Sequence, residues 1–275
     1  MGDITLMPGI ICCVCNHKGG VGKTSLTCNL GSSLALKQKR VLIIDNDPQA
    51  NASGILLLNN TSVKNTLYEL LDTEVDDSEK PPIEDCIYPT KQKNLFCLPN
   101  TEETSGIEME FAAHYPESLN FLKNQVKAYA RKHFDYTLID CSPTLSLFVA
   151  NALHTSDCAI VPIDAGSAYS LDGLRKVLEL IDTIQKSGNP DLRFLRLAIN
   201  RVDLRTSISK IIIGDINDRF GKDQVFESTI PVNTSFQQAE YAKETIFSWA
   251  PTSRGAAAYR KLANEFLSIF EKKSR

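Results

Sequence analysis

The sequence predicts an α/β protein built on a single doubly wound, mostly parallel sheet that is flanked by helices. Short apolar runs of strand length alternate with longer segments that carry apolar residues at helical spacing. The strand-like runs are rich in leucine and β-branched residues and lack strong polar alternation, which is typical of parallel strands buried on both faces. A glycine-rich stretch joins the first of these runs to the first helical segment.

The expected elements alternate along the whole chain. Right-handed crossovers would place helices on both faces of the sheet, and a ligand would then lie at the carboxyl ends of the strands. Strands are expected near residues 10–15, 41–45, 94–98, 136–140, 158–163, 194–200 and 225–229. Helices are expected at 25–37, 117–132, 145–154, 170–186, 206–220 and about 255–273.

Length and composition favour one domain spanning residues 1–275. Residues from about 73 to 93 form an acidic, proline-containing loop within that domain rather than a linker. The sequence has no apolar run of membrane-spanning length, and its beginning lacks the basic-then-apolar order of a secretory signal. A cytoplasmic location is therefore expected.

The eight cysteines are expected to be reduced packing residues. Most fall in or beside predicted buried strands, where a free thiol behaves as a small hydrophobe. Cys12 and Cys15 have the spacing of a metal-binding pair. A strand would turn these two side chains toward opposite faces, however, which is poor geometry for one metal ion.

The glycine-rich stretch, residues 16–25, reads Asn-His-Lys-Gly-Gly-Val-Gly-Lys-Thr-Ser. His17 stands where the standard Walker A pattern has glycine, so the stretch is a variant of that pattern. Backbone amides and the positive end of the helix dipole converge at such a junction and favour a bound polyphosphate. Lys23 would reach the β- and γ-phosphates, and Thr24 would place its hydroxyl on Mg²⁺. The expected phosphate-binding residues are Lys18, Gly19, Gly20, Val21, Gly22, Lys23, Thr24 and Ser25.

This loop resembles the deviant Walker A motif of the ParA/MinD family of ATPases, whose pattern is Lys-Gly-Gly-x-Gly-Lys-[Ser/Thr]. The likeness continues through residues 41–49, 136–143, 230–233 and 250–256, and the last two segments resemble ParA/Soj-type partition proteins more closely than MinD. The resemblance implies a P-loop NTPase fold, ATP/ADP and Mg²⁺ as ligands, and hydrolysis of ATP to ADP and phosphate.

Three aspartates are the expected acidic site residues. Asp140 ends a predicted strand beside the loop and can hold Mg²⁺ together with Thr24. The resemblance makes Asp45 a second, outer-sphere partner of Mg²⁺, and makes Asp47 the group that orients or activates the attacking water. The alternative for Asp45 or Asp47 is an aspartate that caps a turn before proline.

Lys18 is the second lysine of the loop. In the ParA/MinD family the corresponding lysine reaches the phosphates of the partner subunit's nucleotide, which implies an ATP-dependent homodimer. A cation placed against charge developing on the γ-phosphate assists hydrolysis. The expected catalytic residues are therefore Lys18, Lys23 and Asp47. The alternative for Lys18 is a solvated lysine at the loop entrance.

Base contacts are expected at positions where relatives hold adenine. The asparagine amides can pair with the donor and acceptor edge of the base. These positions are Asn200, Arg201, Pro231, Val232 and Asn233.

The resemblance also implies non-specific DNA binding by the ATP dimer, association with the nucleoid, and a ParB-like or other cargo adaptor that stimulates hydrolysis. Arg205, Lys210 and Arg219 are the candidate DNA contacts, because DNA affinity follows local clusters of basic residues. Many relatives carry an arginine where this chain has Val232.

Three alternatives remain open. One is ParA-like positioning of a protein cargo. Another is a MinD-like ATPase that cycles on membranes through residues 266–273, although Tyr259, Leu262 and Phe266 continue an apolar stripe typical of a helix packed on its own domain, so no stable membrane association is expected. A third is an iron–sulfur reductase relative, for which Cys97 and Cys141 are the only candidates by order.

Overall fold

The computed structural model describes residues 9–58, 60–166 and 170–271, and its centre is a seven-stranded sheet of order β3-β4-β2-β5-β1-β6-β7. Every neighbouring pair is parallel except β3 and β4. The predicted mostly parallel sheet is thereby confirmed. The strands are β1 (Ile10–Val14), β2 (Val41–Asn46), β3 (Tyr88–Pro89), β4 (Leu95–Leu98), β5 (Tyr136–Cys141), β6 (Cys158–Asp164) and β7 (Arg193–Asn200).

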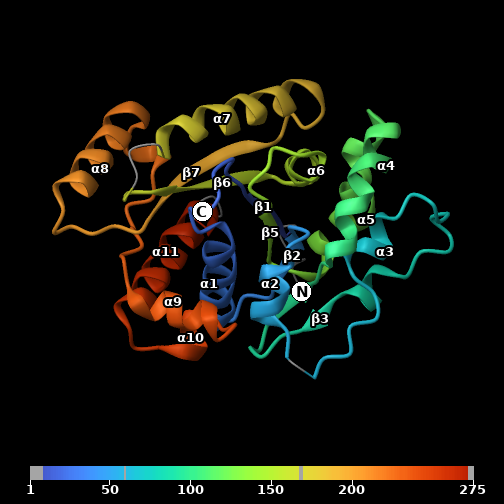
Figure 1. The fold of residues 1–275 in the computed structure, drawn as a ribbon, viewed down its shortest axis with the longest axis horizontal. Coiled ribbons are helices and arrows are strands. Elements are labelled where there is room, and N and C mark those ends of the chain that lie inside the picture. Colours follow the sequence, from blue (N-terminus) through green and yellow to red (C-terminus); the bar gives the residue numbers. More distant parts are fainter. Residues whose placement is uncertain (1–8, 59, 167–169, 272–275) are drawn as a thin grey trace, which may run out of the picture.

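Helices cover both faces of this sheet (Figure 1). One face packs against α1 (Lys23–Leu36), α2 (Asn51–Leu56), α10 (Ile246–Trp249) and α11 (Arg254–Glu271). The other packs against α3 (Leu67–Leu71), α4 (Ile107–Ala113), α5 (Phe121–His133), α6 (Leu147–Thr155), α7 (Ser170–Ser187) and α8 (Ser207–Phe220). The remaining helices are α9 (Thr234–Tyr241) and the 3-10 turns η1 (Ile83–Cys86), η2 (Glu102–Gly106), η3 (Glu117–Asn120) and η4 (Lys222–Gln224).

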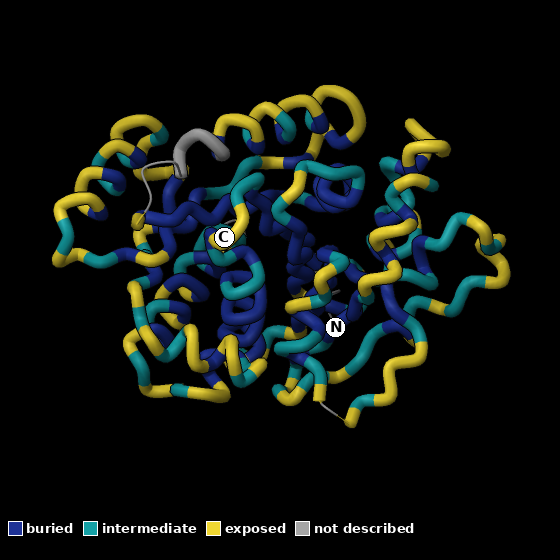
Figure 2. The backbone as a smooth tube through the Cα atoms, viewed as in Figure 1, coloured by how far each residue is buried: buried dark blue, intermediate teal, exposed yellow. Residues whose placement is uncertain are grey.

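The central strands are buried on both sides, as the absence of polar alternation predicts. Every residue of β2, β5 and β6 is buried, and Figure 2 shows this buried centre surrounded by more exposed helices and loops. Along β1 the side chains alternate between the two layers, so that Cys12 packs with α1 and α11 whereas Cys13 packs with α5 and α6. The carboxyl ends of these buried strands therefore supply polar side chains to one edge of the sheet.

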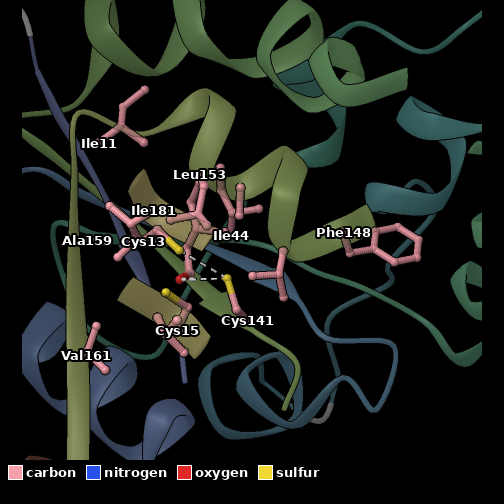
Figure 3. Close-up of a cluster of buried hydrophobic side chains, with 14 of the residues drawn as sticks. Ile11, Cys13, Cys15, Ile44, Cys141, Phe148, Leu153, Ala159, Val161 and Ile181 are labelled. Atoms are coloured by element: carbon pink, nitrogen blue, oxygen red, sulfur yellow. Dashed lines mark hydrogen bonds between the residues drawn. The ribbon is translucent and has the colours of Figure 1, made fainter. Parts of the chain in front are cut away.

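All eight cysteines are free and buried. Figure 3 shows Cys13, Cys15 and Cys141 among apolar side chains, with the Sγ atoms of Cys13 and Cys141 3.4 Å apart. Burial raises the pKa of the Cys13 thiol, which keeps it protonated. Cys12 and Cys15 belong to opposite layers, as predicted. Within the described residues no cluster of histidine, cysteine and acidic side chains could hold a metal ion.

The sequence prediction is wrong at one strand and incomplete at several short elements. Residues 225–229 form no strand, and Val225 makes only an isolated bridge to Leu197. The amides of Glu227 and Ser228 instead donate to the carboxylate of Glu265 in α11, at 2.9 and 3.0 Å. A side chain thus takes the place of a neighbouring strand. The acidic loop contains η1 and β3, and the predicted helix at 117–132 divides into η3 and α5.

The apolar stripe of α11 packs on the sheet, as expected. Tyr259, Leu262 and Phe266 are almost fully buried, and the Phe266 ring contacts the ring of Tyr136 edge-on at 5.3 Å. Among the described helices, none combines the length and the apolarity needed to span a bilayer. The stripe is therefore part of the protein core.

Candidate functional site

The glycine loop occupies residues 15–22, between the end of β1 and the start of α1. Gly20 and Gly22 have φ angles of 73° and 87°, a region that side chains other than glycine rarely adopt. A Cβ atom on Gly22 would also lie 3.0 Å from Nδ2 of Asn200. Gly22 is the N-cap of α1 and provides no side-chain cap, so the amides of the first turn remain available to an anion.

A cavity of about 490 Å³ opens beside this loop. Its volume lies in the usual range for small-ligand sites. The predicted residues that line it are Gly19, Gly20, Gly22, Lys23, Thr24, Ser25, Asp47, Asn200, Arg201, Pro231, Val232 and Asn233. Lys18 and Val21 are not lining residues, and Val21 is buried beneath the loop.

Lys23 lies over the glycine loop. Its Nζ donates to the carbonyl oxygen of Lys18 at 3.0 Å, and the residue is only 7% exposed. Burial lowers the pKa of Lys23, whereas the negative charges of Asp140 and Asp47 oppose that shift. A polyanion in the cavity would act in the same direction as these carboxylates and favour the charged ammonium.

Asp140 is the carboxylate that best fits a cation. Its Oδ1 accepts a hydrogen bond from the hydroxyl of Thr27 at 3.0 Å, while its buried Oδ2 has no partner among the described residues. Burial, reinforced by the charge of Asp45, raises the pKa of Asp140 to about 8, and the hydroxyls of Thr24 and Thr27 offset part of that shift. A divalent cation or its bound water near Oδ2 would favour the ionised form, and carboxylate oxygens are ligands that Mg²⁺ prefers.

Asp45 faces Asp140 across the β2–β5 pair, but both of its oxygens have donors. Oδ1 accepts from the amide of Asp47 at 3.3 Å, and Oδ2 accepts from the amide and the hydroxyl of Ser53, both at 2.7 Å. Burial raises the pKa of Asp45 to about 6. The geometry therefore gives Asp45 the turn-stabilising role that the sequence left open as an alternative, and its contact with Mg²⁺ stays a prediction.

Asp47 combines both of its expected roles. Its Oδ1 accepts from the amide of Gln49 at 3.0 Å, which closes the turn. The same residue is buried and lines the cavity. Ala50 completes the turn with a φ of 51°, which is strained for a residue with a side chain.

The predicted base contacts have further structural roles. Nδ2 of Asn200 donates to the carbonyl oxygen of Val21 at 2.9 Å and so supports the loop. Its buried Oδ1 has no partner within the described chain and could accept from a ligand. Asn233 caps α9, because its Oδ1 accepts from the amide of Ser235 at 2.9 Å. Arg201 lies 3.6 Å from the carboxylate of Asp164.

Part of the cavity wall was not predicted. Gln49, Asn51 and Pro143 line it and lie within or beside the motif segments, so the motifs could have indicated them. The rest of this wall comes from the segment 230–240 and from α11, and no sequence signal marked its side chains as cavity-lining. Those residues are Ile230, Thr234, Phe236, Gln237, Glu240 and Tyr259.

The three candidate DNA contacts lie outside the cavity lining, at and along α8. Arg205, Lys210 and Arg219 are all exposed. The guanidinium of Arg205 makes two hydrogen bonds of 2.8 Å with the carboxylate of Asp203, and this contact lowers the pKa of Asp203 to about 2. The charge of Arg205 is thus partly compensated within its own loop.

A parallel sheet, a strand–glycine loop–helix junction and an unpartnered carboxylate at the adjacent strand end define a P-loop nucleotide-binding protein. Comparisons with known proteins agree with this class. A family model described as an AAA domain matches residues 9–194. The chain is 35% identical over 257 residues to the sporulation initiation inhibitor protein Soj of Bacillus subtilis, covering 94% of this chain and 98% of that protein. It is 33% identical to the chromosome partitioning protein ParA of Caulobacter vibrioides, covering 93% and 92% of the two chains.

The chain therefore belongs to the Soj/ParA family of chromosome-partitioning ATPases, which confirms the resemblance seen in the sequence. Among solved structures, cobyrinic acid a,c-diamide synthase from Mycobacterium smegmatis, with a bound ATP analogue and magnesium, superposes with a TM-score of 0.79. That structure is 26% identical in sequence, and the match covers 96% of each chain.

Proposed function

We propose that this protein is a Mg-ATP-dependent dimerising ATPase that binds DNA non-specifically and partitions or positions plasmid or chromosomal cargo. A ParB-like partner would stimulate its conversion of ATP and water to ADP and phosphate. One observation carries the catalytic part: the glycine loop, Lys23 and Asp47 converge on one cavity, beside an Asp140 oxygen that has no partner among the described residues. The family relatives named above support the cellular part.

The chain's own groups suit the proposed ligands ATP/ADP and Mg²⁺. The first-turn amides of α1 and the ammonium of Lys23 would hold phosphate oxygens. Thr24 and Asp140 would hold the cation, with Asp45 behind them. Mg²⁺ would neutralise charge on the phosphates when bound. Asp47 would orient the attacking water, because its carboxylate lines the cavity from a turn closed by its own Oδ1.

Lys18 would act on the nucleotide of a second copy. Its side chain is half-buried and does not line the cavity of its own chain. A cation supplied across a dimer interface would make hydrolysis depend on dimerisation.

Two variants test this mechanism by sizing chromatography with light scattering in Mg-ATP. Lys18→Ala should bind ATP but remain monomeric, because the shared phosphates lose their second cation. Asp47→Ala should form the dimer and accumulate it, because hydrolysis slows. Lys132→Ala, at an exposed position near the end of α5, is the matched control and should behave like wild type. Wild-type dimerisation by Lys18→Ala would refute the shared-nucleotide mechanism.

DNA binding is assigned to the α8 region, with Arg205, Lys210 and Arg219 as contacts and with the ATP state associated with the nucleoid in the cytoplasm. Charge reversal at Lys210 and Arg219 should weaken binding to any duplex and reduce its dependence on salt by roughly one unit of slope per contact. Fluorescence anisotropy with unrelated duplexes measures this. Unchanged affinity and slope would remove α8 from the DNA surface.

Positioning of a protein cargo is the second candidate, and the pairing of Arg205 with Asp203 favours it because that pairing leaves less uncompensated positive charge for DNA. Pull-down with a cargo adaptor in the absence of DNA would distinguish this function. A membrane cycle has less support, since the apolar stripe of α11 is buried in the core. Neither candidate changes the proposed nucleotide chemistry.

A further inference from the structure

The turn that carries Asp47 depends on one buried serine. Ser53, in α2, is 7% exposed. Its amide and its hydroxyl both donate to Oδ2 of Asp45 at 2.7 Å. Asp45 is itself fully buried and accepts the amide of Asp47 through its other oxygen. The two ends of the turn are therefore bound to one carboxylate.

The same hydroxyl connects α2 to the neighbouring strand. Ser53 Oγ accepts from the amide of Asn100, just after β4, at 3.0 Å. The Oδ1 atom of Asn100 in turn accepts from the amide of Thr101 at 2.9 Å and the hydroxyl of Thr104 at 2.5 Å. A hydroxyl has one donor and two acceptor positions, so Ser53 uses its donor on Asp45 and one acceptor position on Asn100.

The turn needs such support because it contains strained backbone. Ala50 has φ and ψ angles of 51° and 34°, a left-handed conformation that costs free energy for any residue except glycine. Strained conformations persist where surrounding contacts determine them. Hydrogen bonds from Ala50 and Gln49 to Asp47 act within the turn, whereas the Ser53 contact holds it from outside.

We infer that Ser53 is a positioning residue for the proposed ATP hydrolysis, acting through Asp45 and α2 to hold Asp47, Gln49 and Asn51 at the cavity wall. This inference rests on the proposed function. Ser53 does not line the main cavity, so its effect would reach the reacting atoms only through those residues. Misplacement of a catalytic group by a fraction of an ångström is enough to slow a reaction that depends on positioning.

Ser33 provides a matched control within the same protein. It lies in α1, is 1% exposed, and its buried Oγ has no hydrogen-bond partner among the described residues. Ser33→Ala therefore removes the same atom from a similarly buried site without removing a hydrogen bond.

The primary test compares Ser53→Ala, Ser33→Ala and wild type in steady-state ATP hydrolysis with Mg²⁺. Ser53→Ala should lower kcat by about tenfold or more, the effect of losing one hydrogen bond to a charged group. KM for ATP should stay within about twofold, because the phosphate loop is untouched. Ser33→Ala should match wild type. Unchanged kcat in Ser53→Ala, or a raised KM with unchanged kcat, would overturn the inference.

An isosteric pair separates positioning from loss of packing. Threonine and valine have nearly the same shape, but only threonine keeps the hydroxyl. Ser53→Thr should retain at least fivefold higher kcat than Ser53→Val. Equal kcat values in the two variants would show that volume, rather than the hydroxyl, decides the rate, and would refute the role assigned to Ser53.

A second readout does not require hydrolysis. In the nucleotide-free protein, Ser53→Ala should accelerate amide hydrogen exchange about tenfold in residues 47–52, while protection in α1 stays unchanged. Exchange in this turn that equals wild type would overturn the inference. Absence of ATP hydrolysis by the wild-type protein would instead refute the proposed function, and the exchange measurement would then decide the role of Ser53 alone.

Discussion

Replacing Asp140 with asparagine should make the metal-free protein more stable at neutral and alkaline pH. The wild-type carboxyl is fully buried, and its pKa is raised from 3.8 to about 8. Between these two values the folded protein keeps a proton that the unfolded chain has released. Stability therefore falls as the pH rises from about 4, and the loss is complete near pH 8.

The magnitude follows from linkage. One pKa unit corresponds to about 1.4 kcal/mol, and asparagine does not titrate at this position. The free energy of unfolding of Asp140→Asn minus that of wild type should grow by about 1 kcal/mol per pH unit between pH 5 and pH 8. Taking the difference cancels the titration of groups distant from Asp140.

Urea denaturation at pH 5, 6, 7 and 8 with EDTA present measures this difference. Adding Mg-ADP at pH 8 should stabilise wild type more than Asp140→Asn, because the proposed cation favours the ionised carboxylate. A difference that does not change with pH would refute the view that Asp140 is a destabilising buried acid. Equal stabilisation of both proteins by Mg-ADP would remove Asp140 from the cation site.

Other predictions concern single contacts. Gly22→Ala should destabilise the nucleotide-free protein by about 1–3 kcal/mol because of its positive φ, whereas Gly19→Ala, whose Cβ would meet nothing within 4 Å, should have little effect; equal urea midpoints would contradict this. Glu265→Ala should cost about 3 kcal/mol, since its carboxylate accepts from Arg196 and two backbone amides, and a melting temperature equal to wild type would be evidence against it. No thiol should react with Ellman's reagent before denaturation, because all eight cysteines are buried.

Local sequence patterns indicated the regular elements well because each pattern has a local physical cause. The run at 41–45 is apolar throughout because β2 is buried on both faces, and the glycines at 20 and 22 are required by left-handed backbone. The same reasoning failed at 225–229. The apolar residues there are buried, but their chain lies along α11, where the Glu265 side chain takes the hydrogen bonds that a strand would make.

The site was partly predictable for the same reason. Motif positions at strand ends, such as Asp140, lie at the cavity edge because parallel strands present their carboxyl ends together. The roles of Asp45 and Ser53 could not be read from the sequence. Whether a carboxylate is already occupied depends on which donors fold against it, and Asn100 lies far from both in the chain.

The sequence by itself determined the alternation of strands and helices, the phosphate loop and the identity of the residues at the strand ends, because these depend on side-chain periodicity and backbone conformation over short distances. Only the tertiary structure decided that Asp140 keeps an unpartnered oxygen while Asp45 supports the Asp47 turn, and that the segment 230–240 with α11 closes the cavity. Those features arise from contacts between segments distant along the chain, which no local pattern specifies.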